Sequence, residues 1–384
     1  MEKYDVVIVG GGASGLMCAL TIKNKKVLIL EKDNKIGKKI LVTGNGRCNL
    51  TNKNINANFY NTNKVDNYFK IFSNAETLNF FESIGLNCYC DEDGRYYPLS
   101  NHASSVLDCL RLSIEKNNNI CVKTNEKVVK IDKINNEFVI KTQNWEYVST
   151  SVVVCCGGNF NNFFSFDVQV TKFTPALCSL KTSFNSGVNG VRQKNVNASL
   201  VVNNKVIKQE TGEVLFKENS ISGICIFNLS NYYKGEKDCK IVLDLLPMFN
   251  NSKLSLLLQE RTKIYTLSNN ILNGFFYKAL CLNILEKCNL LNKNSKDLCL
   301  EDINKLVSLI KNYNLNVIGY ENNNQIFAGG VNLENLDNNL MLKSTDNLFF
   351  TGEACNVSGI CGGYNLQWAW TSGYVVGTYL SKNK

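Results

Sequence analysis

The sequence predicts an α/β protein whose first domain is built from both ends of the chain, with a second domain inserted between them. Near the N-terminus, an apolar run at 6–9, a glycine-rich turn, an amphipathic stretch and an apolar run at 27–30 form the pattern of strand, helix and parallel strand. From about residue 325 the chain returns to a strand, a glycine-rich turn and a helix. The sequence pattern between these two regions is different: it predicts short strands first and helices afterwards.

These patterns give the expected boundaries. We place the first part of the terminal domain at 1–185, the insertion at 186–320 and the second part of the terminal domain at 321–384. Within the insertion, 186–250 is expected to be β-rich. Residues 251–320 are expected to be helical, because apolar side chains such as Leu254 and Leu258 recur there at helical spacing.

Composition favours a soluble, cytoplasmic enzyme-sized protein. The chain has 384 residues, of which 44% are hydrophobic and 20% charged, as in globular rather than disordered proteins. No charged segment followed by an apolar stretch marks a signal peptide, and glycines interrupt the most apolar N-terminal run, so we expect no membrane span. The sixteen cysteines are scattered without any Cys-x-x-Cys spacing, so we expect reduced thiols rather than a disulfide framework.

The charged and metal-binding residue types limit the possible functions. His102 is the only histidine, which excludes a histidine-based metal site and a Ser-His-Asp triad, and we expect no metal. The formal net charge of +9 is compatible with a nucleic-acid partner. However, Lys and Asn are frequent throughout and only five basic residues are Arg, so the charge equally fits a compositional bias.

The first chemical motif is Gly10-x-Gly12-x-x-Gly15, which follows the first predicted strand and opens the first predicted helix. Its glycines allow a tight turn, a close approach of backbone to a pyrophosphate, and close packing of helix on strand. The N–H groups at the helix start attract phosphate. Glu31, which ends the next strand, is placed to accept hydrogen bonds from ribose hydroxyls. The motif predicts a Rossmann-like dinucleotide site without separating FAD from NAD.

The C-terminal motif separates the two cofactors. An apolar strand at 348–350 is followed by Gly352 and Glu353, the position from which two-dinucleotide flavoproteins supply a carboxylate to the ribityl chain. A glycine-rich turn at 359–363 then leads into a helix that starts near Tyr364. Backbone N–H groups there can hydrogen-bond the pyrimidine edge of a flavin and favour negative charge on the reduced ring. We therefore predict an FAD-binding domain.

Two further glycine-rich segments fit this prediction. The loop at 37–49 places glycines around Asn45 and then Arg47, which suits a loop that wraps a dinucleotide or lines a flavin. The buried run at 153–154 ends in Cys155, Cys156 and a pair of glycines, like the crossing beneath many FAD pyrophosphates. The full set of expected cofactor contacts is Gly10, Gly12, Ala13, Ser14, Gly15, Glu31, Lys32, Lys38, Thr43, Gly44, Asn45, Gly46, Arg47, Cys48, Asn49, Val128, Gly157, Gly158, Gly352, Glu353, Gly363, Asn365 and Leu366.

The long motifs at 37–52 and 359–370 resemble the signatures of one flavoprotein family, and shorter landmarks match along nearly the whole chain. This is the NAD(P)/FAD-dependent oxidoreductase family with aminoacetone oxidase-like, bile-acid-type and ribosomal RNA dihydrouridine synthase-like members. The resemblance implies a β-barrel-like and helical insertion, and a substrate cleft between it and the flavin. It leaves the substrate open among a ribosomal RNA uridine, a steroid-type acyl-CoA and an amine. Residues 159–172 depart from the family pattern, being shorter and rich in Phe, which puts activity in more doubt than binding.

The sequence indicates the electron donor, the general acid and the substrate less clearly than it indicates the flavin. No second GxGxxG is present, so NAD(P)H, if it is the electron donor, docks only transiently. A general acid is needed if a double bond is reduced, and Arg47, Cys48 and Tyr364 are candidates by motif position. Reduction of a ribosomal RNA uridine is the preferred hypothesis, since the insertion carries Lys194, Lys205, Lys208, Lys217, Lys234 and Lys237. The alternatives are a dehydrogenase, desaturase or amine oxidase acting on a small molecule, and a flavin-binding scaffold without turnover.

Overall fold

The computed structural model describes residues 2–158, 160, 162–183 and 187–382. The chain divides into two compact units, one formed by 1–174 with 326–384 and the other by 175–325. The predicted arrangement, with both ends in one unit and the middle in another, has this form, but the boundaries differ. The expected division at 185/186 lies outside the described residues, and the observed units meet at Thr174/Pro175 and Gln325/Ile326. Each unit has its own hydrophobic core.

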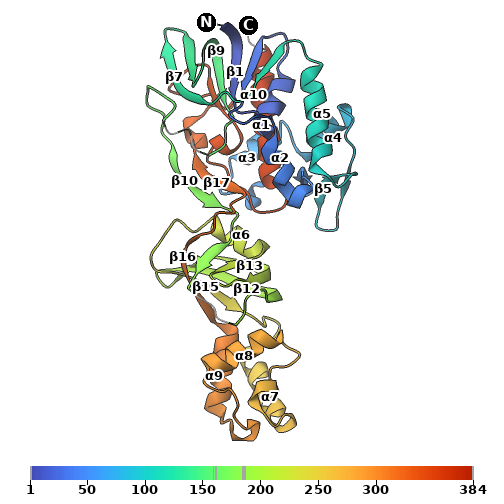
Figure 1. Ribbon diagram of the computed structural model, residues 1–384, viewed down its shortest axis with the longest axis vertical. Coiled ribbons are helices and arrows are strands. Elements are labelled where there is room, and N and C mark those ends of the chain that lie inside the picture. Colours follow the sequence, from blue (N-terminus) through green and yellow to red (C-terminus); the bar gives the residue numbers. More distant parts are fainter. Residues whose placement is uncertain (1, 159, 161, 184–186, 383–384) are drawn as a thin grey trace. The chain divides into compact units, whose positions relative to one another are not determined.

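The first unit is organised around a seven-stranded sheet (Figure 1). Its strand order is β6-β2-β1-β9-β8-β7, and β18 pairs with the carboxyl-terminal half of β9. The strands β6, β2, β1, β9 and β18 run parallel, while β7 and β8 form an antiparallel edge. Their bounds are β1 Glu2–Val9, β2 Val27–Leu30, β6 Ile120–Lys123, β7 Val128–Ile134, β8 Glu137–Thr142, β9 Glu146–Val154 and β18 Leu348–Phe350. The predicted α/β class is confirmed.

The centre of the sheet is buried on both faces, which explains its continuous apolar runs. Residues 6–9 of β1, all of β2 and the end of β9 are at most 3% exposed. The helix α1 (Ala13–Thr21) packs against α10 (Tyr364–Lys382) so closely that methyl groups at Gly373 and Gly377 would collide with backbone oxygens of α1. The two ends of the chain therefore share one core, which ties the C-terminal motif to the N-terminal one.

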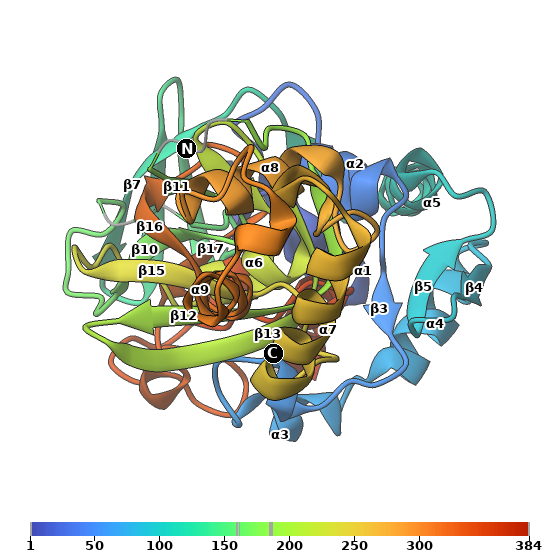
Figure 2. The same ribbon diagram turned by 90° about the horizontal axis from the view of Figure 1, so that it is seen from below.

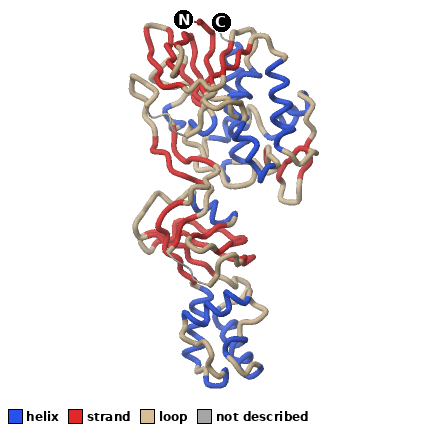
Figure 3. Tube along the Cα trace, in the orientation of Figure 1, coloured by secondary structure: helices blue, strands red, loops and turns tan. Residues whose placement is uncertain are grey.

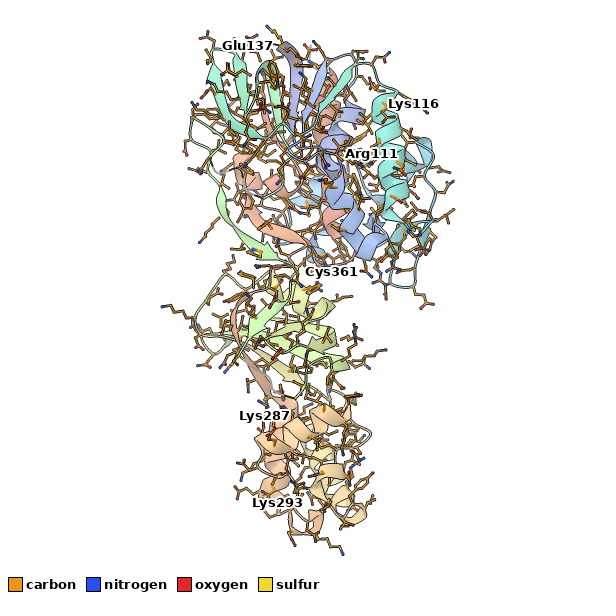
Figure 4. The ribbon with its side chains drawn as sticks, in the orientation of Figure 1. Arg111, Lys116, Glu137, Lys287, Lys293 and Cys361 are labelled. Carbon is orange, nitrogen blue, oxygen red and sulfur yellow. The ribbon has the colours of Figure 1, made fainter. Side chains whose placement is uncertain are left out.

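The remaining elements of this unit lie outside the seven-stranded sheet. Figures 1 and 2 show α4 and α5 beside the small sheet β3-β5-β4. Arg111 of α5, labelled in Figure 4, donates to the carbonyl oxygen of Ile36 at 2.9 Å and so fixes the loop after β2. The bounds are α2 Lys38–Val42, β3 Thr51–Asn52, α3 Val65–Phe69, α4 Asn74–Ser83, β4 Cys88–Cys90, β5 Arg95–Pro98, α5 Ala103–Glu115, β10 Thr171–Ala176 and β17 Ile326–Gly330.

The segment that departs from the family pattern is part of the core. Phe160 is 1% exposed and its ring packs against those of Phe164, Phe173 and Phe350, with centroids 5.4–6.3 Å apart. Phe164 also forms a bridge to Ile131 of β7. Because Phe350 ends β18, this aromatic cluster supports the strand that carries the Gly352-Glu353 turn. Asn159 and Asn161 lie outside the described residues.

The second unit separates strands from helices, as Figure 3 shows by colour. Its strands close into a barrel in the order β11-β14-β13-β12-β15-β16, with β16 returning to β11. The region expected to be helical as far as residue 320 instead ends its last helix at Lys311, and 313–320 form the barrel strand β16. Its alternating burial reflects one face turned to the barrel core. The bounds are β11 Leu180–Thr182, β12 Arg192–Val202, β13 Lys205–Phe216, β14 Ser220–Ser222, α6 Ile224–Ser230, β15 Cys239–Asp244, α7 Asn251–Ile264, α8 Lys278–Lys287, α9 Leu300–Lys311 and β16 Tyr313–Tyr320.

Among the described residues, no helix is both long and apolar enough to span a membrane. The same residues contain no disulfide and no cluster of three potential metal ligands.

Candidate dinucleotide site

The site is built where four parallel strands end in register. Val9 of β1 is paired with both Leu30 of β2 and Val154 of β9, and Val154 is paired with Phe350 of β18. The next residue of each strand continues the hydrogen bonding: Gly10 N donates to Leu30 O at 2.8 Å and Cys155 N to Val9 O at 2.8 Å. All four glycine-rich or acidic motifs thus emerge from one edge of the sheet. Ligands of open parallel sheets bind at such an edge.

The three glycines of the first motif have different surroundings. Gly10 has φ 108° and lies against the end of β9, where an added methyl group would come within 2.7 Å of the carbonyl oxygen of Cys155. At Gly15 a methyl group would overlap the carbonyl oxygen of Gly10. At Gly12 a methyl group would meet no heavy atom of the described chain within 4 Å. Two glycines therefore serve packing, and Gly12 keeps the N-terminus of α1 accessible.

Glu31 is held at the end of β2, beside that turn. Its carboxylate accepts hydrogen bonds from the backbone N–H groups of Gly11 and Asp33, both at 2.9 Å, and the residue is 9% exposed. The backbone N–H of Glu126 donates to Glu31 O at 2.9 Å and brings the start of β7 alongside. Val128 there is buried, whereas Lys32 is exposed. The acidic residue predicted from the motif is therefore fixed next to the glycine turn.

The loop after α2 has an unusual backbone. Gly44 and Asn45 adopt left-handed conformations with φ 55° and 57°, and Cys48 has φ 59°. Thr43 and Gly44 are half-buried and Asn45, Gly46 and Arg47 exposed, while Cys48 and Asn49 are buried. The amide of Asn49 lies between Gly363 N and Thr51 O, at 3.1 and 3.0 Å in the orientation that satisfies both. This loop is thereby joined to the turn before α10.

A pair of charged residues meets where the β9 and β18 turns approach each other. A methyl group at Gly157 would lie 3.3 Å from the Glu353 carboxylate, and one at Gly352 would lie 2.7 Å from Ser14 Oγ on α1. Lys39 Nζ of α2 donates to both Glu353 carboxylate oxygens, at 2.7 and 2.9 Å. Gly158, by contrast, faces Phe327 of β17. Glu353 is thus placed beside the first turn of α1.

The N-terminus of α10 is fixed by its own turn and by a buried network. Asn365 closes the turn, because its amide accepts from Gly359 N at 2.8 Å and donates to Gly359 O at 2.9 Å. Cys361, labelled in Figure 4, belongs to this turn. The first hydrogen bond of the helix runs from Gln367 N to Gly363 O, so the N–H groups of Tyr364, Asn365 and Leu366 precede the helical ladder. The sequence assigns N–H groups at this helix start to the pyrimidine edge of a flavin, and the structure shows Gly363 N facing Asn49 instead of the turn.

The three candidate acids differ in accessibility. Cys48 is 0% exposed, and burial raises the pKa of its thiol to about 12, so it stays protonated at neutral pH. Burial also raises the pKa of Tyr364, whose ring packs on Phe59 with centroids 4.7 Å apart. Arg47 is exposed and its guanidinium stacks 4.3 Å from the ring centroid of Tyr97. Only Arg47 of the three presents its charged group to solvent.

The site residues expected from the sequence all lie on unit 1, and the structure adds two residues beside them. Lys38 points to Asp33 at 3.6 Å, whereas its neighbour Lys39, missing from the expected set, faces Glu353. Gln367, also missing, anchors the start of α10 from beneath. The paired lysines of the motif indicated a basic residue at this place, but the sequence does not tell which of two adjacent side chains pairs with Glu353. A buried Gln inside an apolar helix gave none.

Comparison with known proteins identifies the family of the chain. Residues 4–379 match the family model described as HI0933-like protein Rossmann domain. The chain belongs to this family. It is 32% identical to 3-dehydro-bile acid delta(4,6)-reductase of Clostridium scindens, over 96% of this chain and 97% of the relative. It is 24% identical to ribosomal RNA dihydrouridine synthase of Haemophilus influenzae, over the full length of both. Among solved structures, the open conformation of a flavocytochrome c3 fumarate reductase covers 99% of this chain and 78% of its own at 13% identity, with a TM-score of 0.46.

Family membership over nearly the whole chain confirms the predicted resemblance and makes this HI0933-like protein an FAD-dependent oxidoreductase. The residues present fit the cofactor on structural grounds. Gly12 leaves the start of α1 open, Glu31 is held beside the glycine turn, and the first N–H groups of α10 precede its helical hydrogen bonds. The predicted enzyme class is confirmed.

Proposed function

We propose that this HI0933-like protein uses FAD to reduce a carbon–carbon double bond conjugated with a carbonyl group. The observation that carries the proposal is the alignment of the Gly10–Gly15 turn, Glu31 and Glu353 along one sheet edge in register. The names of the two relatives add the reaction class, since a delta(4,6)-reductase of a 3-dehydro steroid and a dihydrouridine synthase both reduce a double bond next to a carbonyl.

The proposed cofactor contacts follow the strand ends. The N–H groups at the start of α1 would hold the pyrophosphate, and Glu31 the adenosine ribose, with Lys32 and Val128 towards the adenine. Glu353 would accept hydrogen bonds from the ribityl hydroxyls. The donor edge at Tyr364, Asn365 and Leu366 would hold the pyrimidine part of the flavin. Bound FAD supplies the hydride. We also propose NAD(P)H as the electron donor and the cytoplasm as the location.

Arg47 is the chain's proposed contribution to substrate activation. Its guanidinium is solvent-facing and oriented by stacking on Tyr97, so it can bind a carbonyl oxygen and stabilise the negative charge that develops there when hydride adds to the conjugated carbon. Cys48, fully buried as a neutral thiol, cannot reach a substrate. Arg47→Met is expected to slow reoxidation by substrate about a hundredfold more than it slows reduction by NAD(P)H.

The preferred substrate is a small enone. The bile-acid relative has the higher identity, 32% against 24%, across a similar share of the chain. A uridine in large-subunit ribosomal RNA is the second candidate, favoured by the charge of the second unit. Its sequence, 175–325, contains 18 basic and 12 acidic residues, and its helical part carries Lys287 and Lys293, labelled in Figure 4.

Anaerobic reoxidation tests the proposal and separates the two substrates. The FAD-loaded protein is reduced with NADPH or NADH, then mixed with a 3-oxo-4-ene steroid or with ribosomal RNA lacking the modification. Return of oxidised flavin with the saturated steroid as product supports the enone. Return with dihydrouridine in the RNA supports the second candidate instead. Reduced flavin that neither substrate reoxidises contradicts the proposed reaction, and protein that binds no FAD contradicts the proposed cofactor site.

A further inference from the structure

The Lys39–Glu353 pair joins two elements that are far apart in the sequence. Lys39 lies on α2 and Glu353 on the 3₁₀ turn after β18, and the ammonium donates to both carboxylate oxygens. The lysine side chain is 54% exposed and that of Glu353 is 18% exposed. An ion pair with such exposure contributes little to stability, because water and salt screen it and two long side chains must be ordered. Breaking the pair therefore costs the fold little stability.

Both partners are anchored to the first turn of α1. The start of α2 is tied to the glycine motif, since Gly37 N donates to Gly11 O at 2.7 Å. Glu353 follows Gly352, which lies against Ser14, and its carboxylate lies over Gly157. The ammonium thus binds a carboxylate whose neighbour Gly352 lies against Ser14, in the first turn of α1. The N-terminus of that helix is the expected pyrophosphate position. An anion there would meet the partial positive charge of the helix and the full charge of Lys39 together.

We propose that Lys39 changes its ionic partner when a dinucleotide binds. Its ammonium group then dissociates from the Glu353 carboxylate and binds the pyrophosphate. The exchange replaces one ionic contact of the lysine with another and frees the Glu353 carboxylate for the ribityl hydroxyls. Lys39 thereby couples two events: binding of the pyrophosphate and release of the Glu353 carboxylate for the ribityl chain. This inference rests on the proposed function, since it assumes that FAD binds along this edge.

Lys38 supplies the matched control. It is adjacent on α2, similarly exposed, and paired instead with Asp33 at 3.6 Å. A general effect of losing a positive charge from α2 would appear in Lys38→Met as well as in Lys39→Met. An effect confined to Lys39→Met assigns the role to the lysine that is paired with Glu353.

The test compares ADP with FAD on the full chain freed of flavin, by calorimetric titration of wild type, Lys39→Met, Lys38→Met and Glu353→Gln. ADP carries the pyrophosphate but no ribityl chain. Lys39→Met is expected to weaken ADP binding about tenfold, the effect of one charge-assisted hydrogen bond, and to flatten its salt dependence. Lys38→Met should stay within about twofold of wild type. Glu353→Gln should strengthen ADP binding, because the competing carboxylate is gone, yet weaken FAD binding.

The opposite results are equally specific. Unchanged ADP affinity in Lys39→Met, with reduced FAD affinity, would overturn the exchange and leave Lys39 as a neutraliser of Glu353. Glu353→Gln that binds ADP more weakly would also overturn it, and this arm does not depend on the folding of the lysine variant. Wild-type protein that binds neither ADP nor FAD would instead remove the proposed function itself.

Discussion

Gly12 and Gly15 belong to one motif, but the structure gives them different physical roles. At Gly15 the backbone of the preceding turn occupies the space of a side chain. Gly12, with φ −84°, has an ordinary backbone conformation and open space where a side chain would start. Its lack of a side chain therefore has no structural cause within the described chain and is explained by the approach of a ligand.

This difference predicts that alanine separates binding from folding. Gly12→Ala is expected to leave the midpoint of thermal unfolding of the flavin-free protein within about 2 °C of wild type, and to weaken FAD binding at least about a hundredfold by blocking the pyrophosphate. Gly15→Ala should lower the free energy of unfolding by about 2–3 kcal/mol, because helix and strand must move apart. Thermal melts and flavin titrations measure both. Full FAD affinity in folded Gly12→Ala would place the pyrophosphate elsewhere.

At the residue scale, the sequence predicted which types of residue form the site better than it predicted which partner each side chain contacts. The spacing of Gly10, Gly12 and Gly15, with an acid at the end of the next strand, sufficed to predict the turn and the position of Glu31. It could not choose between Lys38 and Lys39, because α2 is a five-residue helix whose phase depends on Gly37 at φ 73° and on packing against α5. Motif position also suggested Cys48 as an acid, whereas burial raises its pKa to about 12.

At the scale of elements, α10 is the part that joins the motifs. Gln367, 0% exposed, accepts from Thr51 Oγ1 at 2.5 Å and donates to Thr77 Oγ1 at 2.9 Å, linking α10 to β3 and α4. Trp368 Nε1 donates to Gly352 O at 3.0 Å and Ser372 Oγ accepts from Gly352 N at 2.9 Å. One helix therefore sets the position of the 43–52 loop and of the Glu353 turn.

Removing the buried amide should loosen both loops. Gln367→Leu keeps the approximate volume but leaves the Thr51 and Thr77 hydroxyls without this partner, at a cost of about 1–3 kcal/mol in the free energy of unfolding. We expect FAD affinity to fall about tenfold in addition, since the donor edge at the start of α10 loses its support. Gln143→Leu, an exposed glutamine on the same unit, is the control and should change neither. Denaturant titration with and without FAD distinguishes the two effects. Equal loss in both variants would deny Gln367 this role.

Elements of the second unit show the limit of periodicity. The helical spacing after Leu254 correctly indicated helices, but it could not reveal that the chain leaves them at Lys311 to add β16 to a barrel begun at β11. That strand pairs with β15 and β11, and pairings across such sequence distances leave no local pattern. The predicted boundary at 320/321 missed the end of the unit for the same reason.

At the scale of the whole molecule, each unit has a core of its own. The first core draws on residues 4–160 and 331–380, and the second on 180–317. The chain leaves the first unit within β10 and returns to it at β17. These two strands pair, and Gly329 lies against the carbonyl oxygen of Lys172. A discontinuous domain was predictable because both ends carried halves of one motif set. The crossing points were not, because a pairing between strands about 150 residues apart leaves no local sequence pattern.

These separate cores predict that the first unit folds and binds FAD alone. Joining Thr174 to Ile326 through a short Gly-Ser linker removes the second unit while keeping β17 and residues 171–174 of its partner strand β10. The shortened chain is expected to unfold in one cooperative transition and to bind FAD within about threefold of the intact protein, since the proposed contacts come from unit 1. The same shortened chain with Glu31→Ala controls for non-specific flavin binding. Loss of FAD affinity in a folded shortened chain would mean that the second unit supplies part of the cofactor site, and would require the site proposed on the sheet edge to be extended beyond unit 1.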